Sequence, residues 1–116
     1  MARHDFRGAV EKRRANTLIF RETDAMRQGV QATLIELQAD RVVVDTEDEF
    51  DGNESVKLEL TNQMQRFQTK VRGQVDSVDK QRNGFRIAFS LMSRLNPHEV
   101  LTLRMQIRPD APQQWF

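Results

Sequence analysis

The sequence predicts a mainly all-β protein, a six-stranded antiparallel β-barrel followed by one C-terminal amphipathic helix. Three observations lead to this prediction. Short β-prone runs alternate between apolar and polar residues, which is the period of a half-buried strand. Turn-forming residues separate these runs at short intervals, so neighbouring strands are expected to pair antiparallel. The pattern changes to a helical spacing only once, near the end of the chain.

Length and composition indicate one globular domain. The chain has 116 residues, of which 38% are hydrophobic and 30% are charged, and its net charge is +1. A chain of this length has a core of its own but no room for a second domain. The absence of Cys excludes disulfides, thiolate metal sites and cysteine nucleophiles. No stretch reaches the roughly 18 apolar residues of a membrane span, and the charged N-terminus lacks a signal-peptide core, so we expect a cytoplasmic protein.

Charge is distributed unevenly along the chain. Residues 1–14 form a basic N-terminal arm, whereas residues 45–54 carry six carboxylates and no cation. The acidic stretch contains Asp51-Gly52-Asn53, which predicts a surface loop. Segments of this kind are usually solvated surface, and that interpretation stays open for both of them.

Three strands are expected in the first half of the chain. The first covers residues 16–22, and residues 23–29 connect it to a tight β-turn-β corner. In the corner, Ala32–Leu37 and Arg41–Thr46 are the strands and Gln38-Ala39-Asp40 is the polar break between them. The corner is either a ligand site or merely a turn, and its polar residues are Glu36, Gln38, Asp40 and Arg41.

Three more strands follow in the second half. Ser55–Leu60 alternates cleanly between apolar and polar residues, and Phe67–Asp76 is the longest alternating run. Gly73 lies within that run and predicts a bulge or a sharp bend of the kind that barrels need. Asn83-Gly84 is a hairpin signal, and Phe85–Ser90 then alternates again.

A single helix is expected near the end of the chain. Asn96 can cap its first amides, Pro97 suits the first helical position, and Glu99 completes a capping box. The helix is expected to end at Pro109. Its apolar residues form two sets at helical spacing, Val100, Leu103 and Ile107 in one, Leu101 and Met105 in the other.

The sequence contains no pattern typical of a catalytic or metal site. The two histidines, His4 and His98, lie in the arm and in the first helical turn, so they form no triad or metal cluster with neighbours. No GxGxxG, P-loop or GxSxG motif occurs. The carboxylates of residues 47–51 lie in an expected loop, without an apolar pocket to shift a pKa. We therefore expect no enzyme, no catalytic residue and no metal ligand.

Over residues 11–108, the order and spacing of elements resemble a PilZ domain. In that family a basic arm with an RxxxR motif precedes the first strand, and a D/N-x-S-x-x-G motif spans the second and third strands. The two motifs bind cyclic di-GMP in bacterial cytoplasmic signalling. Here residues 11–17 (EKRRANT) stand in the arm position and residues 36–41 (ELQADR) in the second position. The resemblance implies a candidate nucleotide site made of Arg13, Arg14, Glu36, Gln38 and Arg41.

Both motifs depart from the family pattern. Arg13 and Arg14 can supply one phosphate-clamping guanidinium, but the second arginine is missing at the expected spacing. Glu36 replaces Asp or Asn, Gln38 replaces Ser, and Arg41 replaces Gly. An Arg in place of Gly makes a positive φ costly and fills space that a ligand would need.

Two functions follow from the resemblance. The first is a signalling adaptor that contacts a protein partner and has lost the usual cyclic di-GMP site. The alternative is a cyclic di-GMP receptor with a rearranged site that uses Arg13, Arg14 and Arg41 as its cations.

A single-stranded nucleic-acid-binding barrel is a lower alternative. Such proteins expose aromatic side chains among cations on a strand face. Here Phe67, Phe85 and Phe89 share the apolar parity of their strands, which predicts core positions. The tail, residues 109–116, ends in Trp115-Phe116, which either packs against the body or contacts a partner.

Overall fold

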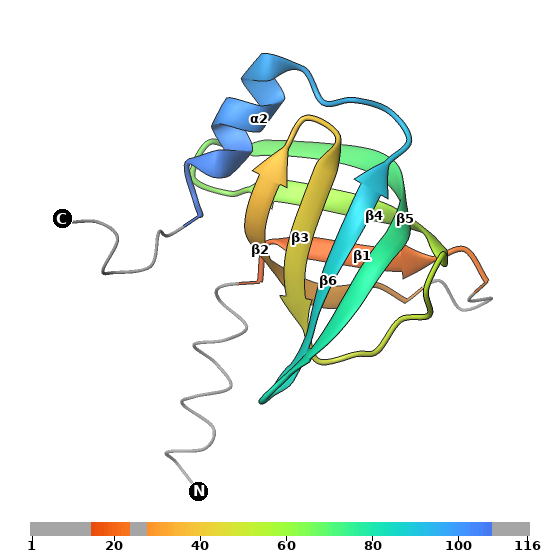
Figure 1. Cartoon of the computed structure of the whole chain (residues 1–116). Helices are drawn as coiled ribbons and strands as arrows, with labels where there is room; N and C mark the ends of the chain where they lie inside the picture. Colours follow the sequence, from red (N-terminus) through yellow and green to blue (C-terminus); the bar gives the residue numbers. More distant parts are fainter. Residues whose placement is uncertain (1–14, 24–27, 108–116) are drawn as a thin grey trace, which may run out of the picture.

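The structure is a computed structural model, and it describes residues 15–23 and 28–107. The expectations for the basic arm, residues 1–14, and for the tail with Trp115-Phe116 lie outside these residues. The predicted order of six strands and one helix is confirmed (Figure 1). The elements are β1 (Thr17–Arg21), β2 (Val30–Gln38), β3 (Arg41–Thr46), β4 (Ser55–Asn62), β5 (Phe67–Gln81), β6 (Gly84–Leu91) and α2 (Pro97–Arg104).

The six strands close into a barrel in the order β1-β2-β3-β6-β5-β4. Every neighbouring pair is antiparallel, as predicted. β1 completes the ring because Thr17 pairs with Ala32 of β2 on one side and with Leu60 of β4 on the other. Each of the six strands therefore has a hydrogen-bonded neighbour along both edges.

One apolar core fills the barrel, and the predicted strand parities place its members. The inward positions of all six strands contribute to it, among them Ile19, Leu34, Leu37, Val42, Val44, Leu58, Leu60, Val75, Ile87 and Phe89. Phe89 is fully buried and Phe67 and Phe85 pack against the core, as predicted for these aromatics. From α2, Leu103 is buried in the same cluster, and the helix lies across one end of the barrel (Figure 1).

The start of α2 has the predicted capping box. The Asn96 side chain accepts a hydrogen bond from the Glu99 amide at 2.8 Å, and the Glu99 carboxylate accepts one from the Asn96 amide at 2.9 Å. The helix ends at Arg104, earlier than the expected stop at Pro109. After it, the amides of Gln106 and Ile107 bond to carbonyls only three residues back, at 3.4 and 3.0 Å. These tighter turns bring Ile107 against the core instead of extending the helix.

The bulge expected at Gly73 is at a different position. Gly73 pairs regularly, and the register of β5 shifts between Val75 and Ser77, so Asp76 is the extra residue. Gly73 is instead a point of close strand approach, because a Cβ there would lie 3.2 Å from the carbonyl oxygen of Ser90.

Candidate functional site

A bulge in β2 determines which way the corner residues face. The register with β3 shifts between Leu34 and Glu36, so Ile35 is the extra residue of the strand. Side chains alternate from Ala32 to Leu34, and without the bulge Glu36 would be the next to point inward. With it, the alternation reverses: Leu37 is buried and Glu36 is exposed.

Three of the five predicted site residues meet on the outer surface of this corner. Glu36, Gln38 and Arg41 are all exposed. Gln38 and Arg41 are directly opposite each other across the turn, and Glu36 is two positions further along β2, on the same face as Gln38. The other two predicted residues, Arg13 and Arg14, lie outside the described residues.

The guanidinium of Arg41 forms an ion pair within the barrel. One of its terminal guanidinium nitrogens lies 3.4 Å from a carboxylate oxygen of Asp76, the bulged residue of β5. The two side chains are 44% and 51% exposed, so solvent screens the pair and its contribution to stability is small. Its importance is geometric, because it draws the Arg41 side chain from the corner across β6 towards β5.

Asn16 fixes the place at which the chain enters the barrel. Its side-chain oxygen accepts a hydrogen bond from the Leu34 amide at 2.8 Å, beside the bulge of β2. Its own amide donates to the Ala32 carbonyl, and its carbonyl accepts from the Thr61 amide. The first described residues therefore lie against the strand that carries Glu36. Sequence reasoning did not single out Asn16, because a polar residue at a strand start is common.

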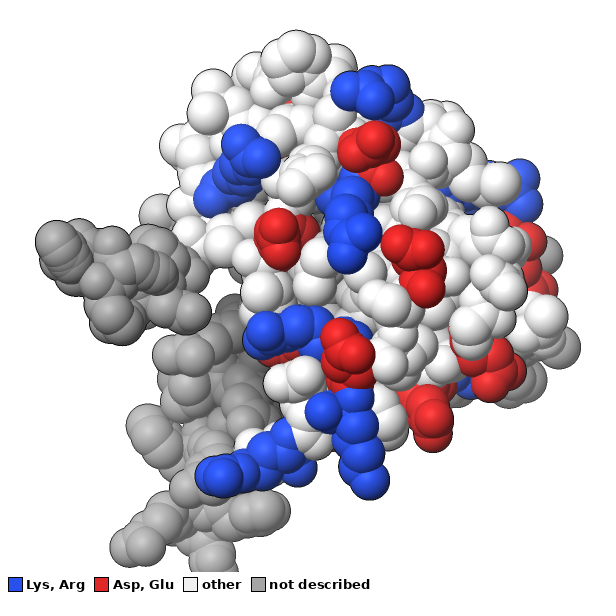
Figure 2. Space-filling view, viewed as in Figure 1, with Lys and Arg blue, Asp and Glu red and all other residues white. Residues whose placement is uncertain are grey.

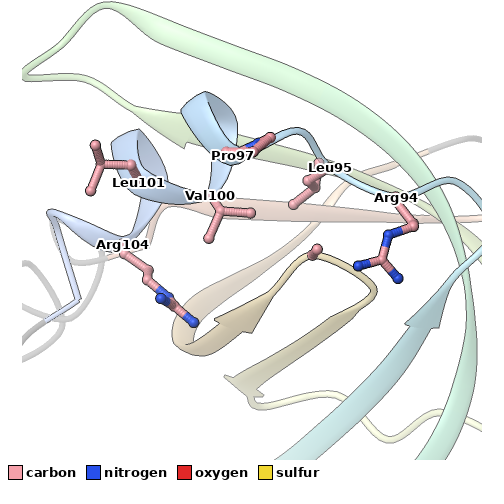
Figure 3. Close-up of a pocket in the computed structure, with 7 residues that line it drawn as sticks. Arg94, Leu95, Pro97, Val100, Leu101 and Arg104 are labelled. Atoms are coloured by element: carbon pink, nitrogen blue, oxygen red, sulfur yellow. The ribbon is translucent and has the colours of Figure 1, made fainter.

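A shallow groove lies on the other side of the same turn, between it and α2 (Figure 3). Its volume is about 630 Å³, and its lining residues are Ala39, Arg94, Leu95, Pro97, Val100, Leu101 and Arg104. None of the predicted site residues lines it. The sequence did not reveal the groove because its walls come from the turn, the connection before α2 and the helix itself. The one available signal was the Leu101–Met105 pair, which stands apart from the main apolar set of the helix.

Basic and acidic side chains alternate over the face shown in Figure 2. Among the described residues, three ion pairs join β3 and its neighbouring segments to other parts of the barrel: Arg94 with Asp40, Arg41 with Asp76, and Arg86 with Asp45. A groove for a nucleic-acid backbone requires cations in excess along its course. Figure 2 instead shows cations and carboxylates interspersed among the described residues of this face.

Comparisons with known proteins leave the family open. The sequence matches no model of a known protein family, and a search of curated proteins gives no match. The PilZ resemblance therefore stays a prediction. Within the described ranges, no group of three or more His, Cys, Asp or Glu could hold a metal ion. No helix formed by these residues has the length and hydropathy needed to cross a membrane.

Proposed function

We propose that this protein is a PilZ-like adaptor of bacterial cyclic di-GMP signalling, which acts in the cytoplasm through contact with a protein partner. The proposal is supported by a closed six-stranded barrel with a C-terminal helix, the arrangement that the resemblance implies. It is also supported by the position of the corner, where the family's second motif would lie.

The observation that carries the adaptor function is the Arg41 side chain. At this position the family has glycine, whose missing side chain leaves the corner open. Here an exposed side chain extends over the outer surface to Asp76, 3.4 Å away. This side chain occupies space that glycine would leave open, and the exposed carboxylates of Glu36 and Asp76 would repel a phosphate there. The family's usual nucleotide-binding geometry is therefore absent from this surface.

A receptor with a rearranged site is the second candidate, and Asn16 favours it. Asn16 bonds to Leu34 at the β2 bulge, so the described part of the chain begins beside the strand that carries Glu36 and Gln38. Arg13, Arg14 and Arg41 could then share one anionic ligand.

Isothermal titration calorimetry with cyclic di-GMP separates the two candidates. For the adaptor we expect no saturable heat at micromolar protein. Saturable heat that disappears in the Arg13→Ala plus Arg14→Ala variant would refute the adaptor function and establish the receptor. The matched control removes two exposed cations elsewhere, Lys57→Ala plus Arg82→Ala, and separates a site from a general loss of positive charge.

A further inference from the structure

Exposed apolar side chains are concentrated at the C-terminal part of the described chain. Of the four large hydrophobic side chains exposed among the described residues, three belong to α2, its C-cap or the connection before it. Leu101 and Met105 are 64% and 60% exposed and lie one turn apart, and Met92 precedes the helix. Leu101 also lines the groove between α2 and the β2–β3 turn. The exposed Leu101 side chain thus extends the apolar lining of the groove to the surface, and the methionine one turn further along the chain is a side chain that adapts well to different partners.

This helix is held rigidly in place. Its buried face contributes Leu103 to the core, and the side-chain nitrogen Nδ2 of Asn62 donates a buried hydrogen bond of 2.7 Å to the Thr102 carbonyl. The Gln106 side chain donates to the Thr61 carbonyl at 2.7 Å. Because these bonds fix one face of α2 on the barrel, the opposite face is presented to a partner without a cost for ordering it.

A cation stands at each end of the apolar groove (Figure 3). At one end, the side chain of Arg94 is 73% exposed and lies 3.6 Å from Asp40, a pair that solvent weakens. At the other end, Arg104 donates through Nε to the Leu37 carbonyl at 2.9 Å, which fixes its orientation. Arg104 forms no ion pair with any carboxylate of the described residues.

These charges argue against a second copy as the occupant. A two-fold dimer places the same patch of both copies face to face. Two such grooves would bring the arginines of one copy towards those of the other, in an apolar contact that strengthens their repulsion. The complementary occupant has apolar side chains in its middle and carboxylates at both ends.

We propose that the groove between α2 and the β2–β3 turn binds an acidic amphipathic helix of a partner protein. Its apolar side chains would cover Val100 and Leu101, and its carboxylates would pair with Arg94 and Arg104. α2 forms one wall of the groove and is about 12 Å long, so about eight residues of a partner helix lie along it, and this length sets the spacing of the carboxylates in a probe peptide. This proposal rests on the adaptor function above and names the chemistry of its partner.

A designed probe peptide tests this. It is an alanine-based helix of about sixteen residues, long enough to form in water, with two leucines one turn apart and glutamates about eight residues apart on the same face. Fluorescence anisotropy of the labelled peptide should show saturable binding in the micromolar range. Arg94→Glu plus Arg104→Glu should weaken binding by about tenfold or more. The same variant should bind a peptide with lysines in place of the glutamates, and the unaltered protein should not bind that peptide.

Two controls separate the groove from general effects. Arg82→Glu reverses an exposed charge in the β5–β6 turn, and Met64→Asp alters an exposed side chain in the β4–β5 turn, so both should leave binding unchanged. Leu101→Asp should abolish it. Arg94→Glu alone should weaken peptide binding about threefold. This single variant keeps the hydrogen bond from Arg104 to the Leu37 carbonyl, so a loss of binding cannot come from loss of that bond.

Several results would overturn the proposal. One is an absence of binding, and another is equal affinity for the acidic and basic peptides. Concentration-dependent dimerisation that is lost in Leu101→Asp would assign the groove to a second copy. A red shift of Trp115 emission in that variant without peptide would assign it to the chain's own C-terminal segment, because Trp115 is the only tryptophan. None of these results would refute the adaptor function, which the cyclic di-GMP titration tests separately.

Discussion

Replacement of Asn62 by alanine should weaken the attachment of α2 to the barrel and lower the stability of the whole barrel. Asn62 is 2% exposed at the end of β4, and its side-chain amide donates to the Thr102 carbonyl over 2.7 Å. The last carbonyls of a helix have no partner within it. Those of Leu101 and Leu103 accept bonds from amides further along the chain, whereas Thr102 depends on this side chain from another element.

The size of this destabilisation follows from the hydrogen-bonding groups that the substitution leaves without a partner. A buried carbonyl without a partner costs about 1–3 kcal/mol. The Asn62 side-chain oxygen also accepts from the Gln65 amide at 3.3 Å, a longer bond whose loss adds a few tenths. We therefore expect a loss of about 2 kcal/mol in the free energy of unfolding. For a domain of this size each kcal/mol lowers the melting temperature by roughly 4–8 °C, so the decrease should be roughly 10 °C.

Thermal unfolding followed by circular dichroism measures this shift. Gln63→Ala is the matched control, since Gln63 is the exposed neighbour and should change the melting temperature by no more than about 2 °C. Asn62→Asp keeps the shape but turns a donor into an acceptor, so at neutral pH it should destabilise at least as much. A carboxyl is harder to ionise in a buried position than in water, so acid should favour its protonated form. The lost stability should therefore return as the pH falls, when the protonated carboxyl can donate to Thr102. A melting temperature of Asn62→Ala equal to that of Gln63→Ala would show that the bond does not anchor the helix.

Two further substitutions test other parts of the barrel. Gly84→Ala should cost at least about 2 kcal/mol, because a Cβ there collides with the Thr46 carbonyl oxygen, and wild-type denaturant stability would contradict the backbone contact. Arg21→Met should make the acidic loop more sensitive to proteolysis and cost about 1 kcal/mol, since the guanidinium lies 4.2 Å from the Phe50 ring centre and pairs with Glu54 at 3.2 Å. Unchanged cleavage between residues 47 and 54 would show that Arg21 does not hold this loop.

Patterns confined to one element were predictable from the sequence. The strand parities, the β5–β6 hairpin and the Asn96 cap depend on neighbours in the chain, and the structure has all three, although the hairpin turn is formed by Arg82 and Asn83 and Gly84 already belongs to β6. The corner was also found at the correct place, with Gln38 and Arg41 flanking its turn. For these features, local propensity and packing point the same way.

Features that depend on distant partners could not be predicted. Ile35 and Asp76 are the extra residues of the two bulges, and neither carries a local signal such as glycine. The two bulges turn Glu36 outward and place Asp76 within reach of Arg41, 35 residues away in sequence. The role of Asn62 likewise depends on a helix 40 residues further along. A one-residue shift exchanges the two faces of a strand, so such errors change the predicted site while leaving the predicted fold intact.

The residues that maintain the fold are different from the corner residues that could bind a nucleotide. Glu36, Gln38 and Arg41 lie outside the apolar core, and the one ion pair of Arg41 is weak, so their identity has little effect on the stability of the barrel. A nucleotide site at this corner can therefore be lost without loss of the fold. The groove on the other side of the turn differs in this respect, because its wall is α2, which Asn62 and Leu103 fix to the barrel. The contacts that attach α2 to the barrel therefore also hold this wall of the groove in place.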